Sequence, residues 1–218
     1  GIDVEWLLDN FHIVDDVIKE VRRDMPPGYD AVLPKLSDTP LKTYPRVYAI
    51  AVSLTAHTDG EFDEARIHRF VAAFQEKAGL TIGELWALPT MLRLVLLENL
   101  RRLAEEMAWS WRERRRADEW LEADEADRPP LGETTGPFVA RLMQAPRTSE
   151  SKAPSSKAVG DRLRAGGVDV DAVVGRENHR QAANQVTVGN SVVTLRLLSA
   201  IDWNAFFEQQ SPVQKILL

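Results

Sequence analysis

Hydrophobic residues recur at helical spacing along most of the chain. Between residues 3 and 25 they alternate at spacings of four and three, which places them on one stripe of a helix: Leu7, Phe11, Val14, Ile18, Val21 and Met25. The same pattern predicts further helices at 45–59, 61–78, 137–145, 169–201 and 202–210. No segment is convincing as a strand. The sequence therefore predicts an all-α fold, a multi-helix bundle.

The longest segment without a helix breaker runs from Pro89 to about Ala126. Thr81 and Glu84 predict a capping box just before it, and Pro89 should kink or restart the helix because proline lacks a backbone donor. At 1.5 Å per residue this segment would be ~55 Å long. We expect it to be the central helix of a bundle of roughly seven to nine helices.

The stretch PRTSESKAPSSKAVG, residues 146–160, has low complexity and is predicted to be a flexible linker or loop. It separates a helical bundle over residues 1–145 from C-terminal helices over 161–218, which we expect to pack on the same bundle. The last predicted helix opens at Ser211 with a proline and a capping glutamine, yet few residues follow. We expect that helix to be truncated because the sequence belongs to a longer chain.

The composition narrows the classes of function. Hydrophobic residues at 44% and charged residues at 28% are ordinary for a soluble globular protein of 218 residues. A net charge of −6 gives no basic field for nucleic acid, and the lack of cysteine excludes disulfides and thiolate metal sites. The longest apolar stretch, residues 85–100, contains Arg93 and Glu98, whereas a membrane span needs about 20 mostly apolar residues. We therefore predict no membrane span and no nucleic-acid partner.

Motifs that could carry catalysis are weak. The glycines form no phosphate-binding loop, and the four histidines, far apart in the chain, show no metal-ligand spacing: His12, His57, His68 and His179. Asp169 and Asp171 resemble the Asp-x-Asp pair with which nucleotide-sugar transferases hold a divalent metal, but helix capping is the simpler interpretation. The arginine run at 114–116 lies among acids, which indicates a solvated face. We predict no catalytic residue, metal or cofactor.

The densest polar patch is ENHRQAANQVTVGNS, residues 177–191. Its amides and its arginine either join helices by hydrogen bonds inside the bundle or line a groove for a polar ligand. The candidate ligand-binding residues are Asn178, Arg180, Asn184, Gln185 and Asn190.

The six tryptophans suggest both core and surface positions. Trp6, Trp86 and Trp203 lie in apolar helical contexts and are predicted to belong to the core. Trp109, Trp111 and Trp120 cannot all face the same way, so at least one should be exposed. An exposed tryptophan on a long helix favours a partner surface over a sugar-binding platform.

Long blocks of the sequence resemble the N-terminal region of the cyclic β-1,2-glucan synthases. They cover about half of the chain, in family order, as residues 5–36, 44–64, 80–107 and 177–213. The resemblance implies a very large glycosyltransferase of the bacterial inner membrane that uses UDP-glucose to grow a β-1,2-glucan on itself and then cyclises it. The family's transferase module, membrane spans and phosphorylase-like module correspond to no residues of this sequence.

The resemblance and the helical pattern together lead to two hypotheses. In the first, the chain is a non-catalytic scaffold or regulatory region on the cytoplasmic side of the membrane. Its partners would be the transferase and phosphorylase-like modules of the parent. In the second, it binds β-1,2-glucan or the acceptor through the amides at 178–190 and an exposed tryptophan.

Overall fold

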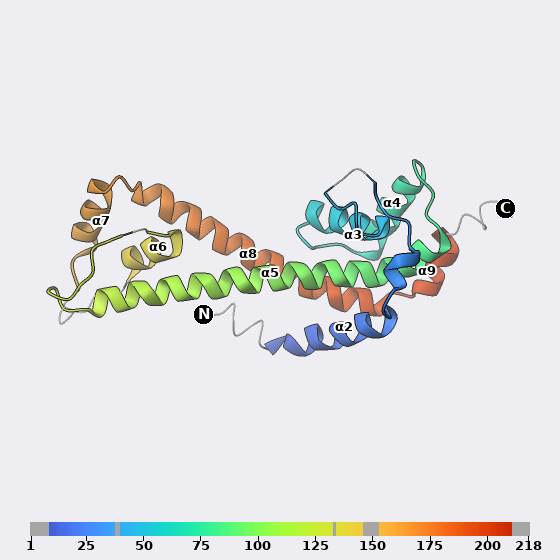
Figure 1. The fold of residues 1–218 in the computed structure, drawn as a ribbon, viewed down its shortest axis with the longest axis horizontal. Coiled ribbons are helices and arrows are strands. Elements are labelled where there is room, and N and C mark those ends of the chain that lie inside the picture. The colour runs from blue at the N-terminus through green and yellow to red at the C-terminus, as the bar shows by residue number, and fades with distance from the viewer. Residues whose placement is uncertain (1–8, 38–39, 133, 146–152, 211–218) are drawn as a thin grey trace. The chain divides into compact units, whose positions relative to one another are not determined.

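The computed structural model describes residues 9–37, 40–132, 134–145 and 153–210. In these ranges the chain forms eight α-helices, one short 3-10 helix and no strand, which confirms the predicted all-α class with one long helix (Figure 1). The elements are α2 (Phe11–Asp24), η1 (Tyr29–Val32), α3 (Arg46–His57), α4 (Glu64–Gln75), α5 (Ile82–Glu122), α6 (Gly136–Gln144), α7 (Ser156–Ala165), α8 (Val170–Ala200) and α9 (Trp203–Gln210). None of the helices in these ranges combines the length and apolarity needed to cross a membrane.

The chain divides into two compact units. Unit 1 comprises Gly1–Arg101 and Val186–Leu218, and unit 2 comprises Arg102–Gln185, so α5 and α8 contribute residues to both. This division differs from the predicted boundary at 146–160. Helix α7 begins at Ser156 and takes the last five residues of the predicted linker, because Ser155 caps it by accepting a hydrogen bond from the Ala158 amide. Residues 146–152 and the predicted last helix at 211–218 lie outside the described residues.

Unit 1 is built on the first half of α5, with α3 and α4 beside it (Figure 1). Its core includes large apolar side chains that are almost fully enclosed, two phenylalanines among them: Val47, Leu54, Phe62, Ile67, Leu88, Met91, Leu92, Leu96, Leu195, Leu198 and Phe206. Polar contacts link the helices around this core. Gln75 on α4 donates to Gln210 on α9 at 3.1 Å, and Arg93 on α5 donates to the Leu198 carbonyl on α8 at 3.2 Å.

The predicted capping box at the start of α5 is confirmed and is also part of a buried ion pair. The Thr81 amide donates to Glu84 Oε2 at 2.8 Å, and the Glu84 amide donates to Thr81 Oγ1 at 3.2 Å. The same carboxylate receives Arg46 from α3, with Nε at 2.8 Å from Oε1 and Nη2 at 2.7 Å from Oε2. Glu84 is fully buried. One side chain therefore begins α5 and fixes α3 against it.

The turn between α3 and α4 needs a glycine. Gly60 has a φ of +76°, in the left-handed region that favours glycine, and a Cβ there would lie 2.7 Å from Ser191 Oγ on α8. Thr194 Oγ1 donates to the Gly60 carbonyl at 2.8 Å. The missing side chain allows the turn to lie directly against α8.

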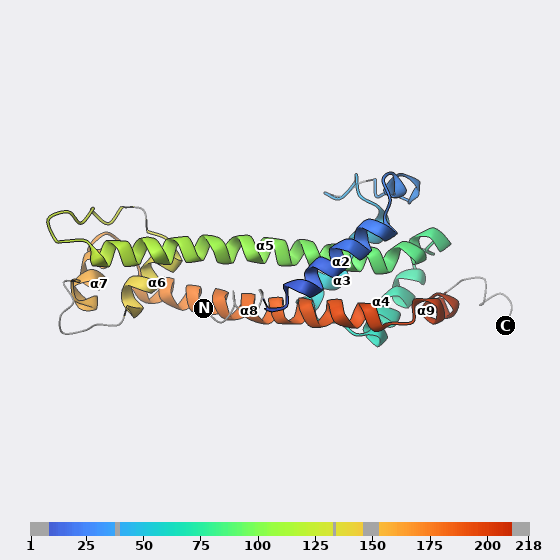
Figure 2. The ribbon, with the colours of Figure 1, turned by 90° about the horizontal axis from the view of Figure 1, so that it is seen from below.

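Unit 2 has its own core, in which α6 and α7 pack against the second half of α5 and the first half of α8. Figure 1 shows α6 between those two segments, and Figure 2 shows the same elements at right angles. The buried members are Ala117, Trp120, Leu121, Phe138, Val139, Leu142, Val159, Leu163 and Val170. The Trp120 indole donates to the Pro129 carbonyl at 2.9 Å, which ties the loop after α5 to this core.

Two sequence predictions need correction, the apolar stripe of α2 and the restart of the helix at Pro89. On α2 the buried residues are Val17 and Val21, whereas Phe11 of the predicted stripe is exposed. The predicted helix at 169–201 is confirmed as α8, whose buried apolar residues are Val170, Val188, Val192, Leu195 and Leu198, whereas Val186 and Val193 face solvent. Pro89 does not restart the helix, because α5 continues through it.

Candidate binding site

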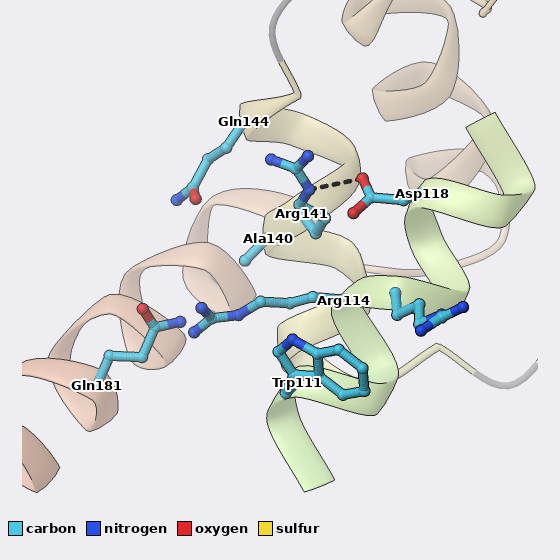
Figure 3. Close-up of a pocket in the computed structure, with 8 residues that line it drawn as sticks. Trp111, Arg114, Asp118, Ala140, Arg141, Gln144 and Gln181 are labelled. Carbon is cyan, nitrogen blue, oxygen red and sulfur yellow. Dashed lines mark hydrogen bonds and ion pairs between the residues drawn. The ribbon is translucent and has the colours of Figure 1, made fainter. Parts of the chain in front are cut away.

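A pocket of about 350 Å³ lies within unit 2, lined by side chains from α5, α6 and α8 (Figure 3). Four of its residues come from α5: Trp111, Arg114, Arg115 and Asp118. Their spacing of three, one and three places them on one face of the helix. Ala117 and Leu121, three and seven positions after Arg114, lie at the border of that face and pack into the core. The helix thus presents an apolar side to unit 2's core and a polar side, with one tryptophan, to the pocket.

Trp111 is the most accessible of the tryptophans on this segment. Its side chain is 55% exposed, against 39% for Trp109 and 5% for Trp120. The Arg115 guanidinium lies 5.6 Å from the centre of the Trp111 ring, a cation–π contact, and forms an ion pair with Glu119 at 3.2 Å. The indole is therefore held in place by Arg115 while much of it stays open to solvent.

Helix α6 contributes the second wall. Pro137 occupies its first turn, which suits proline, and Phe138 and Leu142 anchor it in the core. Arg141 then points toward α5 and donates from Nε to Asp118 Oδ1 at 2.7 Å (Figure 3). Gln144 donates from Nε2 to Asn178 Oδ1 on α8 at 3.2 Å. The wall is thus connected to both neighbouring helices.

Helix α8 contributes the third wall through Gln181. Figure 3 shows Arg114 extending from α5 toward Gln181. Gln181 Nε2 donates to Glu177 Oε1 at 2.7 Å, and Arg114 Nη2 lies 3.9 Å from the same oxygen. Arg114 is thus only loosely paired, because Glu177 is already engaged by closer donors.

A buried polar network supports the pocket. Glu177 is 3% exposed and receives Arg180 at 2.9 and 2.8 Å, while Arg180 also donates to Ser110 at 2.6 Å and forms an ion pair with Glu106. Hydrogen bonding to Glu177 raises the pKa of Arg180, although burial opposes this. Burial alone would raise the pKa of Glu106, but hydrogen bonds from Arg180 and Asn184 outweigh it and lower that pKa. Arg180 and Glu106 are therefore held ionised, and their ion pair fixes α5 to α8 within unit 2.

The pocket offers acceptors as well as donors. Gln144 and Gln181 each use one amide N–H within the protein, so each keeps its amide oxygen and a second N–H to meet a ligand. Arg114 supplies donors, and Asp118 keeps a second carboxylate oxygen beside the one that Arg141 contacts. This set suits a group that both donates and accepts hydrogen bonds. In the described part of the chain, no cluster of histidine, aspartate and glutamate could hold a metal ion.

The structure divides the five predicted ligand-binding residues. Asn178, Arg180 and Asn184 form hydrogen bonds within unit 2, as described above, and Gln185 is exposed at the end of that unit. Asn190 belongs to unit 1 and donates to the Asp59 carbonyl at 3.4 Å. Helix–helix hydrogen bonding, one of the two interpretations of this patch, thus accounts for Asn178, Arg180 and Asn184. A ligand-binding role for the five residues stays a prediction.

The predictions for the tryptophans are partly confirmed. Trp111 and Trp109 are exposed, as expected of at least one of the three on α5, but Trp120 is buried and cannot contribute to a partner surface. Trp86, predicted to lie in the core, is 54% exposed, although its ring lies 4.5 Å from that of Phe207. Trp203 is half-buried, and Trp6 lies outside the described residues.

The remaining polar motifs have structural roles. Asp169 Oδ1 accepts from the Ala172 amide at 3.1 Å and so caps α8, which confirms the simpler interpretation of the Asp-x-Asp pair. In the arginine run, Arg115 and Arg116 form ion pairs along α5 with Glu119 and Glu113. His57 and His68 are hydrogen-bonded, to the Ser53 carbonyl and to Gln210.

Sequence reasoning missed the pocket because its walls come from three separated segments. Asp118, Arg141 and Gln144 had no assigned role, and Gln181 was only one amide of the polar patch. A signal was available: Trp111 and the polar residues three, four and seven positions later share one helix face. That spacing predicts a polar face with one aromatic, but it does not say that α6 and α8 would enclose it.

A comparison with known proteins gives the chain a relative. It is 37% identical, over 225 aligned positions and 98% of its own length, to the cyclic beta-(1,2)-glucan synthase NdvB of Rhizobium meliloti (strain 1021). This match confirms the predicted resemblance to that family. The chain spans 8% of the length of that relative. No family model matches the sequence.

Proposed function

Because the chain is homologous over nearly its whole length to a segment of a cyclic β-(1,2)-glucan synthase, we propose that it is a non-catalytic, helical scaffold segment of such an enzyme. In this proposal the parent is a membrane glycosyltransferase that uses UDP-glucose, and this segment lies near its N-terminus on the cytoplasmic side. Its partners are the transferase and phosphorylase-like modules of the same chain.

The observation that carries the scaffold role is how the buried charged side chains are used. Among the described residues these are Glu84, Arg93 and Glu177. Glu84 on α5 pairs with Arg46 on α3. Glu177 holds Arg180 of its own helix, which in turn pairs with Glu106 on α5. Arg93 Nε lies 3.2 Å from Glu20 Oε2 of α2 without hydrogen-bond alignment, and its Nη2 donates to α8.

Buried charges that are paired in this way suit a structural role rather than proton transfer. A general acid needs a pKa raised toward the working pH, so that it carries a proton at neutral pH. Burial raises the pKa of Glu84, but hydrogen bonds from Arg46 and Thr81 lower it further than burial raises it. A carboxylate that is held ionised and enclosed in this way stabilises a helix junction and is poorly suited to donate a proton.

The test is to delete this segment from the full-length synthase and to measure three quantities separately. These are the amount of folded enzyme in the membrane, the glucan bound to protein, and the cyclised product. A scaffold predicts that the deletion lowers the amount of folded enzyme, and that glucan and cyclic product fall in proportion. The proposal fails if folded enzyme is unchanged while glucan formation is lost, or if all three quantities are unchanged.

A matched pair of point variants separates folding from chemistry. Glu84→Gln in the full enzyme should lower the folded amount and leave the rate per folded molecule unchanged. Glu98→Gln removes a carboxylate from an exposed pair with Arg101 on the same helix, so it should change neither quantity. A fall in the rate per folded molecule for Glu84→Gln alone would contradict the non-catalytic role.

A further inference from the structure

We propose that the Trp111 pocket of unit 2 binds a short run of a neutral sugar chain, namely a β-1,2-linked glucose oligomer. The proposal rests on the proposed function, because membership of a glucan synthase is what supplies this sugar to the segment. It goes beyond that function by assigning a ligand class and residues to one pocket.

Trp111 supplies the aromatic surface of the pocket. Its indole is 55% exposed at a pocket otherwise lined mainly by polar side chains. Exposing a large apolar ring costs free energy, and one face of a sugar ring, which carries C–H groups, would cover it. The contact with Arg115 orients the indole before any ligand arrives. A partly open, oriented ring is what stacking of a sugar requires.

The polar lining distinguishes a sugar from an anion. The amides of Gln144 and Gln181 donate and accept hydrogen bonds, the Asp118 carboxylate accepts them, and the lining arginines donate them: Arg114, Arg115 and Arg141. A hydroxyl group can satisfy both kinds of partner. Each of these arginines already faces a carboxylate of the protein, so a phosphate or carboxylate would have to compete for its charge and would be repelled by Asp118. A hydroxyl-rich, uncharged ligand therefore fits the whole set.

The pocket is preorganised and small. Arg141 and Asp118 are joined across its walls at 2.7 Å, and Gln181 is fixed by the buried Glu177. Side chains that are already ordered lose less conformational entropy on binding. The volume of about 350 Å³ is near the lower end of the range of roughly 300–1,000 Å³ for small-molecule pockets. It suits a short stretch of a chain rather than a whole macrocycle.

The test is isothermal titration calorimetry of this chain with linear β-1,2-linked glucose oligomers. We expect saturable binding that Trp111→Ala weakens about tenfold or more, since buried aromatic anchors dominate binding energy. The matched control is Trp86→Ala, which removes a tryptophan of nearly equal exposure, 54%, from unit 1. It should leave the affinity within about twofold of the unsubstituted chain. Equal losses for the two variants, or no binding by the unsubstituted chain, would overturn the proposal.

Two further titrations test the ligand class. Inorganic phosphate should give no binding at this pocket. A β-1,4-linked glucose oligomer of equal length should bind more weakly, because its hydroxyls are placed differently along the chain. If phosphate binds and Trp111→Ala or Arg114→Ala abolishes it, the pocket is an anion site and the proposal is wrong. If the β-1,4 oligomer binds as tightly, the assignment to β-1,2-glucan is wrong.

The failure of this proposal is distinguishable from failure of the scaffold role. In the full-length synthase, Trp111→Ala should leave the amount of folded enzyme unchanged and should change the length distribution of the glucan product. An unchanged product distribution contradicts the sugar site and leaves the deletion result unaffected. A deletion without effect on folded enzyme contradicts the scaffold role, whatever the calorimetry gives.

Discussion

The substitution Glu84→Gln isolates the charge of the carboxylate that begins α5. Glutamine has nearly the same shape and can still accept the capping hydrogen bond from the Thr81 amide. What it loses is the ion pair with Arg46, which is built on two contacts of 2.8 and 2.7 Å. The change in the free energy of unfolding therefore reports the pair rather than the helix cap.

The expected cost follows from burial. Removing one partner of a buried pair typically costs about 3–5 kcal/mol, because the other charge is left without compensation. The Arg46 side chain is 23% exposed, so water partly solvates the orphaned guanidinium. This places the expected cost near the lower end, at about 3 kcal/mol. The exposed control Glu98→Gln should cost about 0.5 kcal/mol or less.

Urea denaturation combined with hydrogen exchange measures the effect. Peptides from α3 and the first half of α5 should exchange faster in Glu84→Gln, whereas peptides from α7, in unit 2, should not change. Hydrogen exchange is measured for each unit separately because two units need not unfold in one transition. A cost for Glu84→Gln as small as that of the control would show that the pair contributes no more than a surface pair, and would refute the reasoning.

The same pair predicts a pH dependence with a definite sign. The pKa of Glu84 is lower in the folded chain than its ordinary value, because the hydrogen bonds from Arg46 and Thr81 outweigh the effect of burial. Its contribution is then complete above the unfolded pKa of about 4.3 and is lost as the pH falls through the folded pKa. The stability gap between the unsubstituted chain and Glu84→Gln should therefore shrink on acidification. A gap that widens at low pH would contradict the assigned direction.

Three further variants test other parts of the fold. Arg180→Met removes the closest cation of the buried Glu177 and leaves it only Gln181 and the more distant Arg114, so it should destabilise unit 2 by about 3 kcal/mol, visible as faster hydrogen exchange in α6 and α7 but not in α3. Gly60→Ala combines a φ of +76° with a clash against a serine of α8 and should lower the melting temperature more than Gly28→Ala, whose added methyl group meets nothing within 4 Å. Asp169→Ala should cost about 1 kcal/mol through loss of the α8 cap, and Mn²⁺ should not change the melting temperature of either form.

The fold was accessible from sequence because helix signals are local. The Thr81–Glu84 box and the helical periodicity of 169–201 both act within a few residues, and each has its counterpart in the structure. Faces were predicted less well. Val186 and Val193 keep helical spacing on α8, yet Val188 and Val192 are the buried valines there, because more than one set of apolar positions fits the same periodicity. Packing partners then decide which stripe is covered.

The candidate site was harder to predict from the sequence than the helices, for a related reason. Predicting that Asp118 meets Arg141, or that Gln144 meets Asn178, requires knowing which helices lie beside each other. Those pairings link residues 23 and 34 positions apart, and no local signal fixes them. Trp111 was identified as a surface candidate from its position on α5, but its pocket depends on tertiary structure alone.

The way in which unit 2 is connected has a consequence for engineering. Its residues, Arg102–Gln185, form one continuous stretch interrupting the sequence of unit 1, and both crossings fall inside helices rather than in loops. A cut at a single site cannot separate the two units, and excising the inner one requires Arg101 to be rejoined to Val186. The inner unit is thus a nested insertion. Grafting it between homologues as a cassette requires the helical phase to be kept at both junctions.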